Sequence, residues 1–180
     1  VGVAFYLLAN LSSQRAKAGK VSAKMAQYLD LVALGTYFDV ASLDYNNRIL
    51  VYAGVKRIQQ NQCRAGISAL LDIAGRDPMS LKASDLGFVL GPRINTAGRM
   101  ETMDIGIECL LANDMQTAYA FAQQLNDLNL ERRQVESKMK QEALAEMQSL
   151  HLDEDNLPAA LVMFDEQWHQ GVIGIVAGRL

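Results

Sequence analysis

The chain has 180 residues, half of them apolar and 21% charged, which is a globular composition and excludes a largely disordered protein. This length allows one good-sized domain or two small ones. The net charge of −3 and the pI of about 5.4 exclude a global basic field, so any binding of a polyanion must come from local arginine clusters or bound metal.

Two cysteines, Cys63 and Cys109, lie in apolar, helix-like surroundings without the CxxC or Cys/His spacing of a zinc site. We interpret them as small buried hydrophobic residues in a reducing compartment. No apolar run reaches the roughly 20 residues of a membrane span, and no segment resembles a signal peptide. We therefore expect a cytoplasmic protein without membrane contact.

The first third of the chain predicts three helices. The first ends near Gly19, and the second runs from about 23 to 34 and is broken by Gly35. Asp39 then falls in an irregular turn. The segment 46–60 has apolar residues at spacings of three with basic residues between them, which predicts an amphipathic helix.

Short helices and glycine turns are predicted in the middle of the chain. Helices are expected over about 65–75 and 104–113. Between them, the stretch "GPRINTAGRM" at 91–100 has the proline and glycines of a helix terminus. We therefore predict a polar turn there, with Gly98 at positive φ.

The longest predicted element is a helix over 114–150, in which apolar residues recur at steps of three and four without an internal Pro or Gly. Such a helix would extend roughly 50 Å and is typical of a spacer or a coiled-coil arm. Beyond it we predict a buried strand over 159–164, a loop over 165–170 and a helix from Gly171. This order predicts that a new α/β unit begins near 156.

Two polar features of the first two thirds are candidates for chemistry. Asp39 is a carboxylate among apolar neighbours, which is costly to bury unless it is paired or bound to metal. An aspartate that caps the next turn is the ordinary alternative. Arg93, Asn95 and Arg99 project from one ten-residue segment. Arginine forks bind phosphates bidentately, so this segment is either a phosphate site or a solvated basic loop.

The third candidate is the loop before the last predicted helix. His169 and Gln170 directly precede Gly171, where free N–H groups at a helix start can bind an anion. The alternative is an ordinary strand–helix connection. Trp168 can stack on a base or simply pack against the core, and His151 is predicted to be a solvated surface residue.

Three stretches together carry a resemblance to a known family. They are "LDLVALGTYFDVASLDYNNRILV", "ASDLGFVLGPRINTAGRM" and "WHQGVIGIVAGRL", with the long predicted helix between the second and the third. In this order they resemble the bacterial RecJ exonucleases, which act on single-stranded DNA in the 5′→3′ direction and belong to the DHH phosphoesterase superfamily. The resemblance covers essentially the whole chain. It implies an α/β fold overall that is mostly helical within these residues.

The resemblance also implies roles for the candidate residues. Asp39 corresponds to the aspartate of the family's fourth motif, which is a ligand of the two catalytic Mn²⁺ or Mg²⁺ ions. The residues implied to contact DNA phosphates are Arg93, Asn95, Arg99, His169, Gln170 and Gly171.

Four regions follow from the same resemblance. They are the end of the DHH phosphoesterase domain at 1–46, a helical subdomain that completes the catalytic core at 47–113, a connecting helix at 114–150 and the start of the DHH-associated α/β domain at 156–180. The chain starts without Met, and the family's other metal-binding motifs are expected outside it. We therefore expect a fragment that has no nuclease activity by itself.

Single-stranded DNA is the implied partner, hydrolysed during DNA recombination and repair. One alternative is another DHH-type phosphoesterase that acts on oligonucleotides or cyclic dinucleotides. A second is a non-catalytic helical adaptor whose 114–150 helix pairs with a partner. The adaptor predicts that Arg93→Ala with Arg99→Ala leaves DNA affinity unchanged, whereas the exonuclease predicts weaker, less salt-dependent binding.

Overall fold

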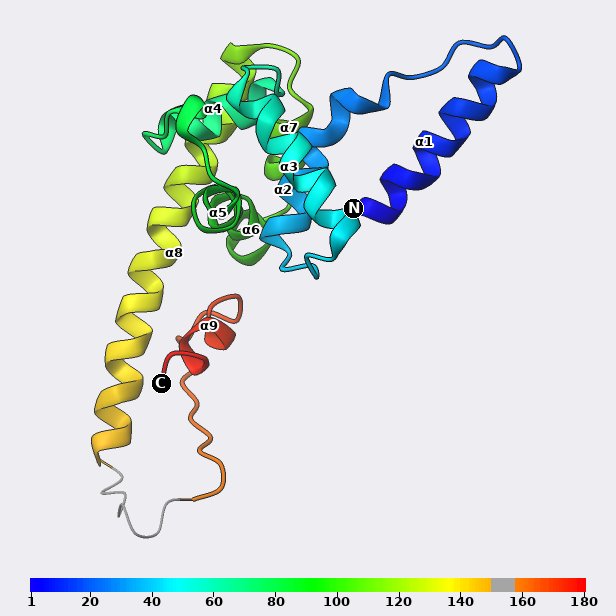
Figure 1. The fold of residues 1–180 in the computed structure, drawn as a ribbon. Helices are drawn as coiled ribbons and strands as arrows, with labels where there is room; N and C mark the ends of the chain where they lie inside the picture. Colours follow the sequence, from blue (N-terminus) through cyan, green and yellow to red (C-terminus); the bar gives the residue numbers. More distant parts are fainter. Residues whose placement is uncertain (150–157) are drawn as a thin grey trace.

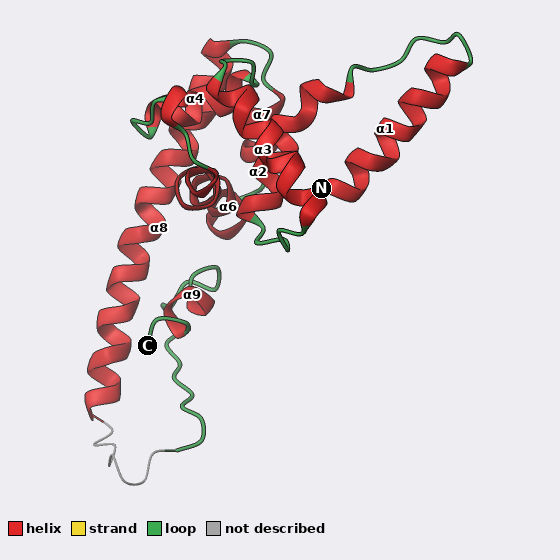
Figure 2. Cartoon of the chain, in the orientation of Figure 1, coloured by secondary structure: helices red, strands yellow, loops and turns green. Residues whose placement is uncertain are grey.

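The computed structural model of the chain describes residues 1–149 and 158–180, and these residues form helices joined by loops (Figures 1 and 2). The predicted fold class, mostly helical in this stretch, is confirmed. The elements in chain order are α1 Gly2–Lys17, η1 Met25–Tyr28, α2 Leu29–Phe38, α3 Tyr45–Gln59, α4 Ala65–Ile73, η2 Pro78–Ser80, α5 Ala83–Asp85, η3 Leu86–Leu90, α6 Gly91–Met100, α7 Asp104–Leu111, α8 Met115–Ser149 and α9 Ile173–Ala177.

The strand predicted over 159–164 is not formed. A strand needs a neighbouring strand to satisfy its backbone hydrogen bonds, and the described residues provide none. Val162 and Phe164 are instead largely exposed, so this apolar run does not have the buried environment that its sequence predicted. His151, predicted to be solvated, lies outside the described residues.

The predicted turn at 91–100 was wrong, because these residues form helix α6. Pro92 lies in the first turn of α6, where its missing N–H is tolerated. The preceding turn η3 widens to a π-helix, and the Gly91 N–H donates to the carbonyl of Leu86. Gly98 lies within the helix and is not among the residues at positive φ. The polar side chains of this segment therefore project from a helix.

Helix α2 is shifted from its predicted span of about 23–34, because residues 25–28 form the 3₁₀ turn η1 and the α-helix extends from Leu29 to Phe38. Gly35 does not break this helix. It is buried within α2, and the side chain of Val1, just before α1, packs directly against it. On the other side α2 packs closely on α3, since a Cβ at Gly54 would lie 2.1 Å from the carbonyl oxygen of Leu29. Asp30 in the first turn is fully buried, and its carboxylate accepts from the backbone N–H groups of Leu31 and Arg64. It thus satisfies a donor at the start of α4.

The larger hydrophobic core is enclosed by α2, α3, α4, α6, α7 and the first half of α8. Its fully buried side chains are mostly leucine and isoleucine. Cys109 is buried in this core as predicted, and burial raises the pKa of its thiol to about 11. Cys63 was predicted to be buried but is only half-buried. The pKa of its thiol is raised, mainly by desolvation.

Helix α8 connects this core with a second, smaller one. Its second half buries Met139 and Ala143 against Val172 and Val176, and α9 accordingly lies beside this half in Figure 1. Part of the apolar row that predicted a spacer or coiled-coil arm thus packs against other elements of the chain, while Met139, Ala143 and Met147 also line an apolar hollow of about 820 Å³ beside residues 161–180. None of the helices in the described part of the chain is long and apolar enough to cross a membrane.

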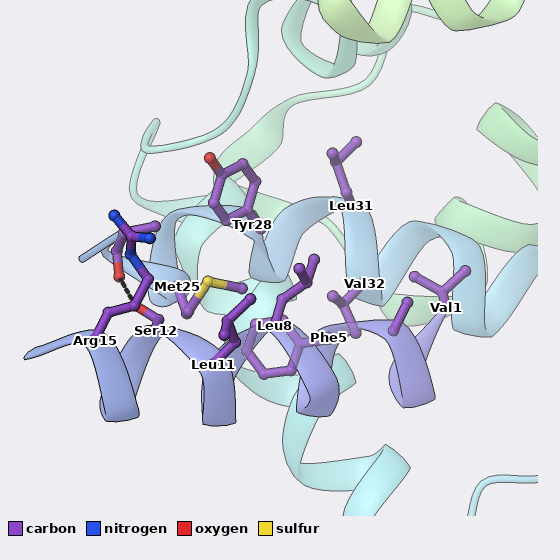
Figure 3. A pocket seen from close by; sticks show the side chains of 12 residues that line it. Val1, Phe5, Leu8, Leu11, Ser12, Arg15, Met25, Tyr28, Leu31 and Val32 are labelled. Atoms are coloured by element: carbon purple, nitrogen blue, oxygen red, sulfur yellow. Dashed lines mark hydrogen bonds between the residues drawn. The ribbon is translucent and has the colours of Figure 1, made fainter. Parts of the chain in front are cut away.

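Helix α1 projects from the core and has no buried residue (Figure 1). Figure 3 shows its side chains Phe5, Leu8 and Leu11 directed towards Met25 and Val32, around an apolar hollow of about 400 Å³. This hollow is lined by residues between 1 and 32 and does not include any candidate site residue.

Candidate functional site

Asp39 lies at the end of α2, as the cap residue after the last helical turn. The Val40 N–H donates to the carbonyl of Tyr37 at 3.3 Å, and the Ala41 N–H donates to that of Thr36 at 3.2 Å. These two bonds form a Schellman motif, which normally has glycine at the position of Val40 because the backbone there is left-handed. Val40 has a φ of 54°, which is unusual for a β-branched residue.

Asp39 is exposed, and its position at a helix end determines what it can bind. The C-terminal end of a helix carries partial negative charge from its free carbonyls. A carboxylate there adds to this negative potential, and the combination attracts a cation. Oxygen ligands of this kind suit Mg²⁺ and Mn²⁺. Asp39 therefore fits the role of one metal ligand.

The loop after Asp39 is held in place by the start of α3. The carboxylate of Asp44 caps this helix by accepting from the Asn47 N–H at 2.8 Å. The side-chain amide of Asn47 donates to the carbonyl of Ser42 at 2.7 Å, and Nε of Arg48 donates to that of Leu43 at 2.7 Å. Sequence reasoning missed these positioning residues, although an aspartate directly before an amphipathic segment is itself an N-cap signal.

Arg93 is directed into the protein and binds α8. Its Nε donates to Oδ1 of Asn126 at 3.2 Å, and its Nη1 donates to the carbonyl of Val89 at 2.7 Å. Desolvation lowers the pKa of this guanidinium, and the nearby charges of Arg133 and Arg76 lower it further. Arg93 thus joins α6 to α8 with part of its donor fork, so its implied DNA contact stays a prediction.

Arg99 is exposed in the last turn of α6 and meets the loop at 169–171. Its Nη1 donates to the carbonyl of Gly171 at 3.3 Å. A Cβ at Gly171 would lie 2.1 Å from the carbonyl oxygen of Arg99, so only glycine permits this approach. The Gly171 N–H in turn donates to Nδ1 of His169 at 3.1 Å. Two predicted site segments, 72 residues apart in sequence, are therefore in direct contact.

The remaining candidates lie near this contact with fewer constraints. Gln170 is exposed next to Gly171, and Asn95 is half-buried on α6. Trp168 donates its indole N–H to the carboxylate of Glu142 on α8 at 3.1 Å, so it packs against the long helix. The helix predicted from Gly171 begins two residues later, at Ile173, and has five residues. The N–H groups of residues 171–173 all donate to His169, so the free N–H groups predicted there for an anion are not free.

Helix α6 separates Asp39 from the contact between Arg99 and Gly171. Phe38, which directly precedes Asp39, packs on Gly91 at the first residue of α6. Arg99 lies eight residues later, or about 12 Å along a helix axis. Within residues 1–149 and 158–180, no group of three or more His, Cys, Asp or Glu side chains is arranged to hold a metal ion. Asp39 is thus a single candidate ligand beside a separate polar region.

An ionic network holds the 169–180 segment against α8. Glu136 is buried on α8 and accepts from the buried Arg132 at 2.5 Å, while its other oxygen accepts from Arg179 beyond α9. Arg132 also donates to Oδ1 of Asn129 at 3.4 Å. In sequence, Arg132 merely interrupts the apolar row of this helix, and only its tertiary partners reveal that it is buried.

Solved structures of RecJ proteins match this arrangement of helices. A RecJ exonuclease bound to manganese aligns with 99% of this chain and 42% of its own length, with a TM-score of 0.80 and 34% identity. RecJ from Thermus thermophilus in complex with Mn²⁺ aligns with 94% of the chain and 24% of its own length, with a TM-score of 0.77 and 32% identity. The fold is therefore that of a RecJ segment.

Sequence comparison gives the same family. The single-stranded-DNA-specific exonuclease RecJ of Dickeya dadantii is 48% identical over all of this chain, and that of Escherichia coli is 46% identical. The chain spans 32% of the length of each. No family model matches the chain. By these matches the chain belongs to the RecJ family and corresponds to about a third of a RecJ protein.

Proposed function

We propose that this chain forms part of a metal-dependent exonuclease that removes nucleotides from single-stranded DNA in the 5′→3′ direction. The observation that carries the proposal is the match over the full chain to proteins named as single-stranded-DNA-specific exonucleases, together with solved relatives that contain Mn²⁺ or Mg²⁺. We further propose that the activity serves DNA repair and recombination in the cytoplasm.

Asp39 is the metal ligand in this proposal. Its carboxylate lies exposed at the negative end of α2, and the loop behind it is fixed by Asn47 and Arg48. Two divalent ions, when bound, supply the activated water and the charge that stabilises the attacked phosphate. Asp39 would be one ligand of these ions, and the other ligands would come from other residues of a RecJ-length protein.

The phosphate contacts come from α6 and the 169–171 loop. Arg99 places an exposed guanidinium beside this loop, and those of its donors that the Gly171 carbonyl does not use suit a phosphate oxygen. Asn95, His169 and Gln170 can add donors nearby. Contacts of this kind neutralise the phosphate charge of the DNA without recognising particular bases, as an exonuclease that acts on any DNA sequence requires. Arg93 contributes less to phosphate binding, because two of its donors already bind Asn126 and the carbonyl of Val89.

The regions inferred from the sequence fit this division of roles. We propose that 1–46 complete the metal-binding domain, 47–113 form its helical subdomain, 114–150 connect and 156–180 begin the second domain. The first half of α8 packs in the larger core and its second half in the smaller core. The helix therefore fixes how far Asp39 lies from the 169–171 loop. An adaptor that pairs through α8 is less favoured, since that helix already packs on both hydrophobic cores of the chain.

The proposal is tested with Asp39→Asn and Arg99→Ala in a RecJ-length protein that contains this chain. Asp39→Asn should reduce Mn²⁺-dependent hydrolysis of single-stranded DNA by about 100-fold or more while the DNA still binds. Arg99→Ala should weaken binding about tenfold and lower the salt slope by roughly 0.7 for each phosphate that is no longer neutralised. Hydrolysis is followed by release of labelled nucleotides, and binding by fluorescence anisotropy at several salt concentrations.

Lys17→Ala is the matched control, because Lys17 is exposed in the last turn of α1, a helix that carries none of the candidate site residues. It should change neither quantity appreciably. Full hydrolysis by Asp39→Asn would contradict the metal role. A marked preference of the unmodified protein for cyclic dinucleotides would favour the phosphoesterase alternative.

A further inference from the structure

Two adjoining hollows lie along α3 and the end of α2, outside the candidate site residues. The larger, about 490 Å³, lies between α3 and the start of α5, with Tyr52 and Lys56 on its wall. The smaller, about 260 Å³, lies between the end of α2 and η3, with Phe88 on its wall. Tyr37 and Leu43 line both, so the two hollows are neighbours and together form the α3 groove.

The α3 groove begins beside Asp39. Phe38 and Val40, the residues on either side of Asp39, both line the smaller hollow. The groove then continues along α3 away from the end of α2. A polymer that reached Asp39 with one end would therefore find the groove along its path.

Two aromatic side chains of the groove are largely exposed. Tyr52 is 66% exposed and Phe88 is 79% exposed, which is unusual for large rings on a folded surface. Exposed aromatic faces bind unpaired bases by stacking, and this binding tolerates any base. Double-stranded DNA has no free base faces to offer, so the rings favour single strands.

The charged side chains that line the groove are all positive, and they lie in its larger hollow. Arg48, Lys56 and Lys82 line the larger hollow, and neither hollow has an Asp or Glu among its described lining residues. Nε of Arg48 is fixed on the carbonyl of Leu43, which orients the rest of its fork. Nζ of Lys56 lies 5.8 Å from the ring centroid of Tyr52, so cation and ring are presented together. On a chain with a net charge of −3, this concentration of positive charge is local.

We propose that the α3 groove binds the single-stranded DNA next to the nucleotide being removed. Bases stack on Tyr52 and Phe88, and the phosphates between them contact Arg48, Lys56 and Lys82. This inference rests on the proposed function for the identity of the polymer. It adds a binding surface that is distinct from the contact of Arg99 with Gly171.

The test is binding of a fluorescent 20-nucleotide oligo-dT, without divalent metal, to a RecJ-length protein that contains this chain, measured by anisotropy at several salt concentrations. Tyr52→Ala with Lys56→Ala should weaken binding about tenfold and flatten its salt dependence, because the variant lacks one stacking platform and one phosphate-binding cation. The matched control is Tyr6→Ala with Lys17→Ala, an exposed aromatic and an exposed lysine on α1. The control should remain within about twofold of the unmodified protein. Circular dichroism checks that each variant is folded.

Arg99→Ala, measured in parallel, separates the two proposals. If Arg99→Ala weakens binding and the groove variant does not, the groove inference is wrong and the proposed function stands. If only the groove variant weakens binding, the groove stands and the phosphate role of Arg99 is wrong. Absence of binding by the unmodified protein, or equal binding of duplex DNA, would overturn the groove inference.

Crosslinking provides an independent measurement. Oligonucleotides that carry 5-iodouracil should crosslink to Tyr52 or Phe88, as mapped by mass spectrometry. Crosslinks found only on other residues would contradict the inference. A change in sedimentation of the groove variant without any change in DNA affinity would show instead that the groove is an interface between copies of the chain.

Discussion

Val40 holds a strained backbone directly beside the candidate metal ligand. Its φ of 54° lies in the left-handed region, where a β-branched side chain crowds the backbone and costs roughly 1–2 kcal/mol. The Schellman hydrogen bonds at the end of α2 require this conformation. The strain is therefore a consequence of ending the helix at Asp39, and it fixes the direction in which that carboxylate leaves α2.

We predict that Val40→Gly stabilises the chain by about 0.5–1 kcal/mol, because relief of the strain exceeds the entropy that glycine loses on folding. Urea unfolding measures the change. Val21→Gly is the control, since Val21 is equally exposed at 88% but has no positive φ. It should be neutral or destabilising. A destabilising effect of Val40→Gly would contradict the assigned backbone strain.

At the scale of elements, α8 is the part that relates the two candidate segments. Its first half belongs to the larger core and its second half to the smaller one. Between them, Glu136 accepts from Arg132 and Arg179 and so attaches the segment after α9 to the helix. A buried carboxylate with two arginine partners is well satisfied, but each partner depends on it.

We predict that Glu136→Ala destabilises the chain by about 2–4 kcal/mol, because the buried Arg132 loses its counter-charge. The larger effect should be local, with faster hydrogen exchange of the 171–178 amides than of the amides in α4. Lys138→Ala, which breaks an exposed pair on the same helix, should change stability by less than about 0.5 kcal/mol. Uniform exchange in both regions would mean that Glu136 does not hold the second segment.

At the scale of the whole molecule, the described residues contain one candidate metal ligand and a separate polar contact at Arg99. A two-metal centre needs several carboxylate or imidazole ligands at once. The purified 180-residue chain should therefore show no Mn²⁺-dependent degradation of single-stranded DNA, as measured by release of labelled nucleotides. Degradation that chelation abolishes and Asp39→Asn removes would contradict this expectation.

How much the sequence could predict is clear at α6. Its proline and glycines predicted a turn, because Pro92 is a helix breaker in most contexts. In the folded chain a π-turn precedes α6, and Pro92 lies in the first turn of that helix, where its missing N–H is tolerated. Burial of Ile94 and Ala97 against the core then stabilises the helix. Local propensity was overridden by packing here, as at Gly35, and neither outcome can be read from neighbouring residues alone.

Periodicity and motif order by themselves determined the long helix, the helical character and the RecJ-family resemblance. Local spacing suffices for these, since an apolar row at steps of three and four is a property of a single helix. The tertiary structure alone decided that Arg99 meets Gly171, that Arg93 is directed towards α8, and that Arg132 is buried with Glu136. These contacts join segments from different helices and loops or depend on how α8 packs, so the positions of the helices in space determine them.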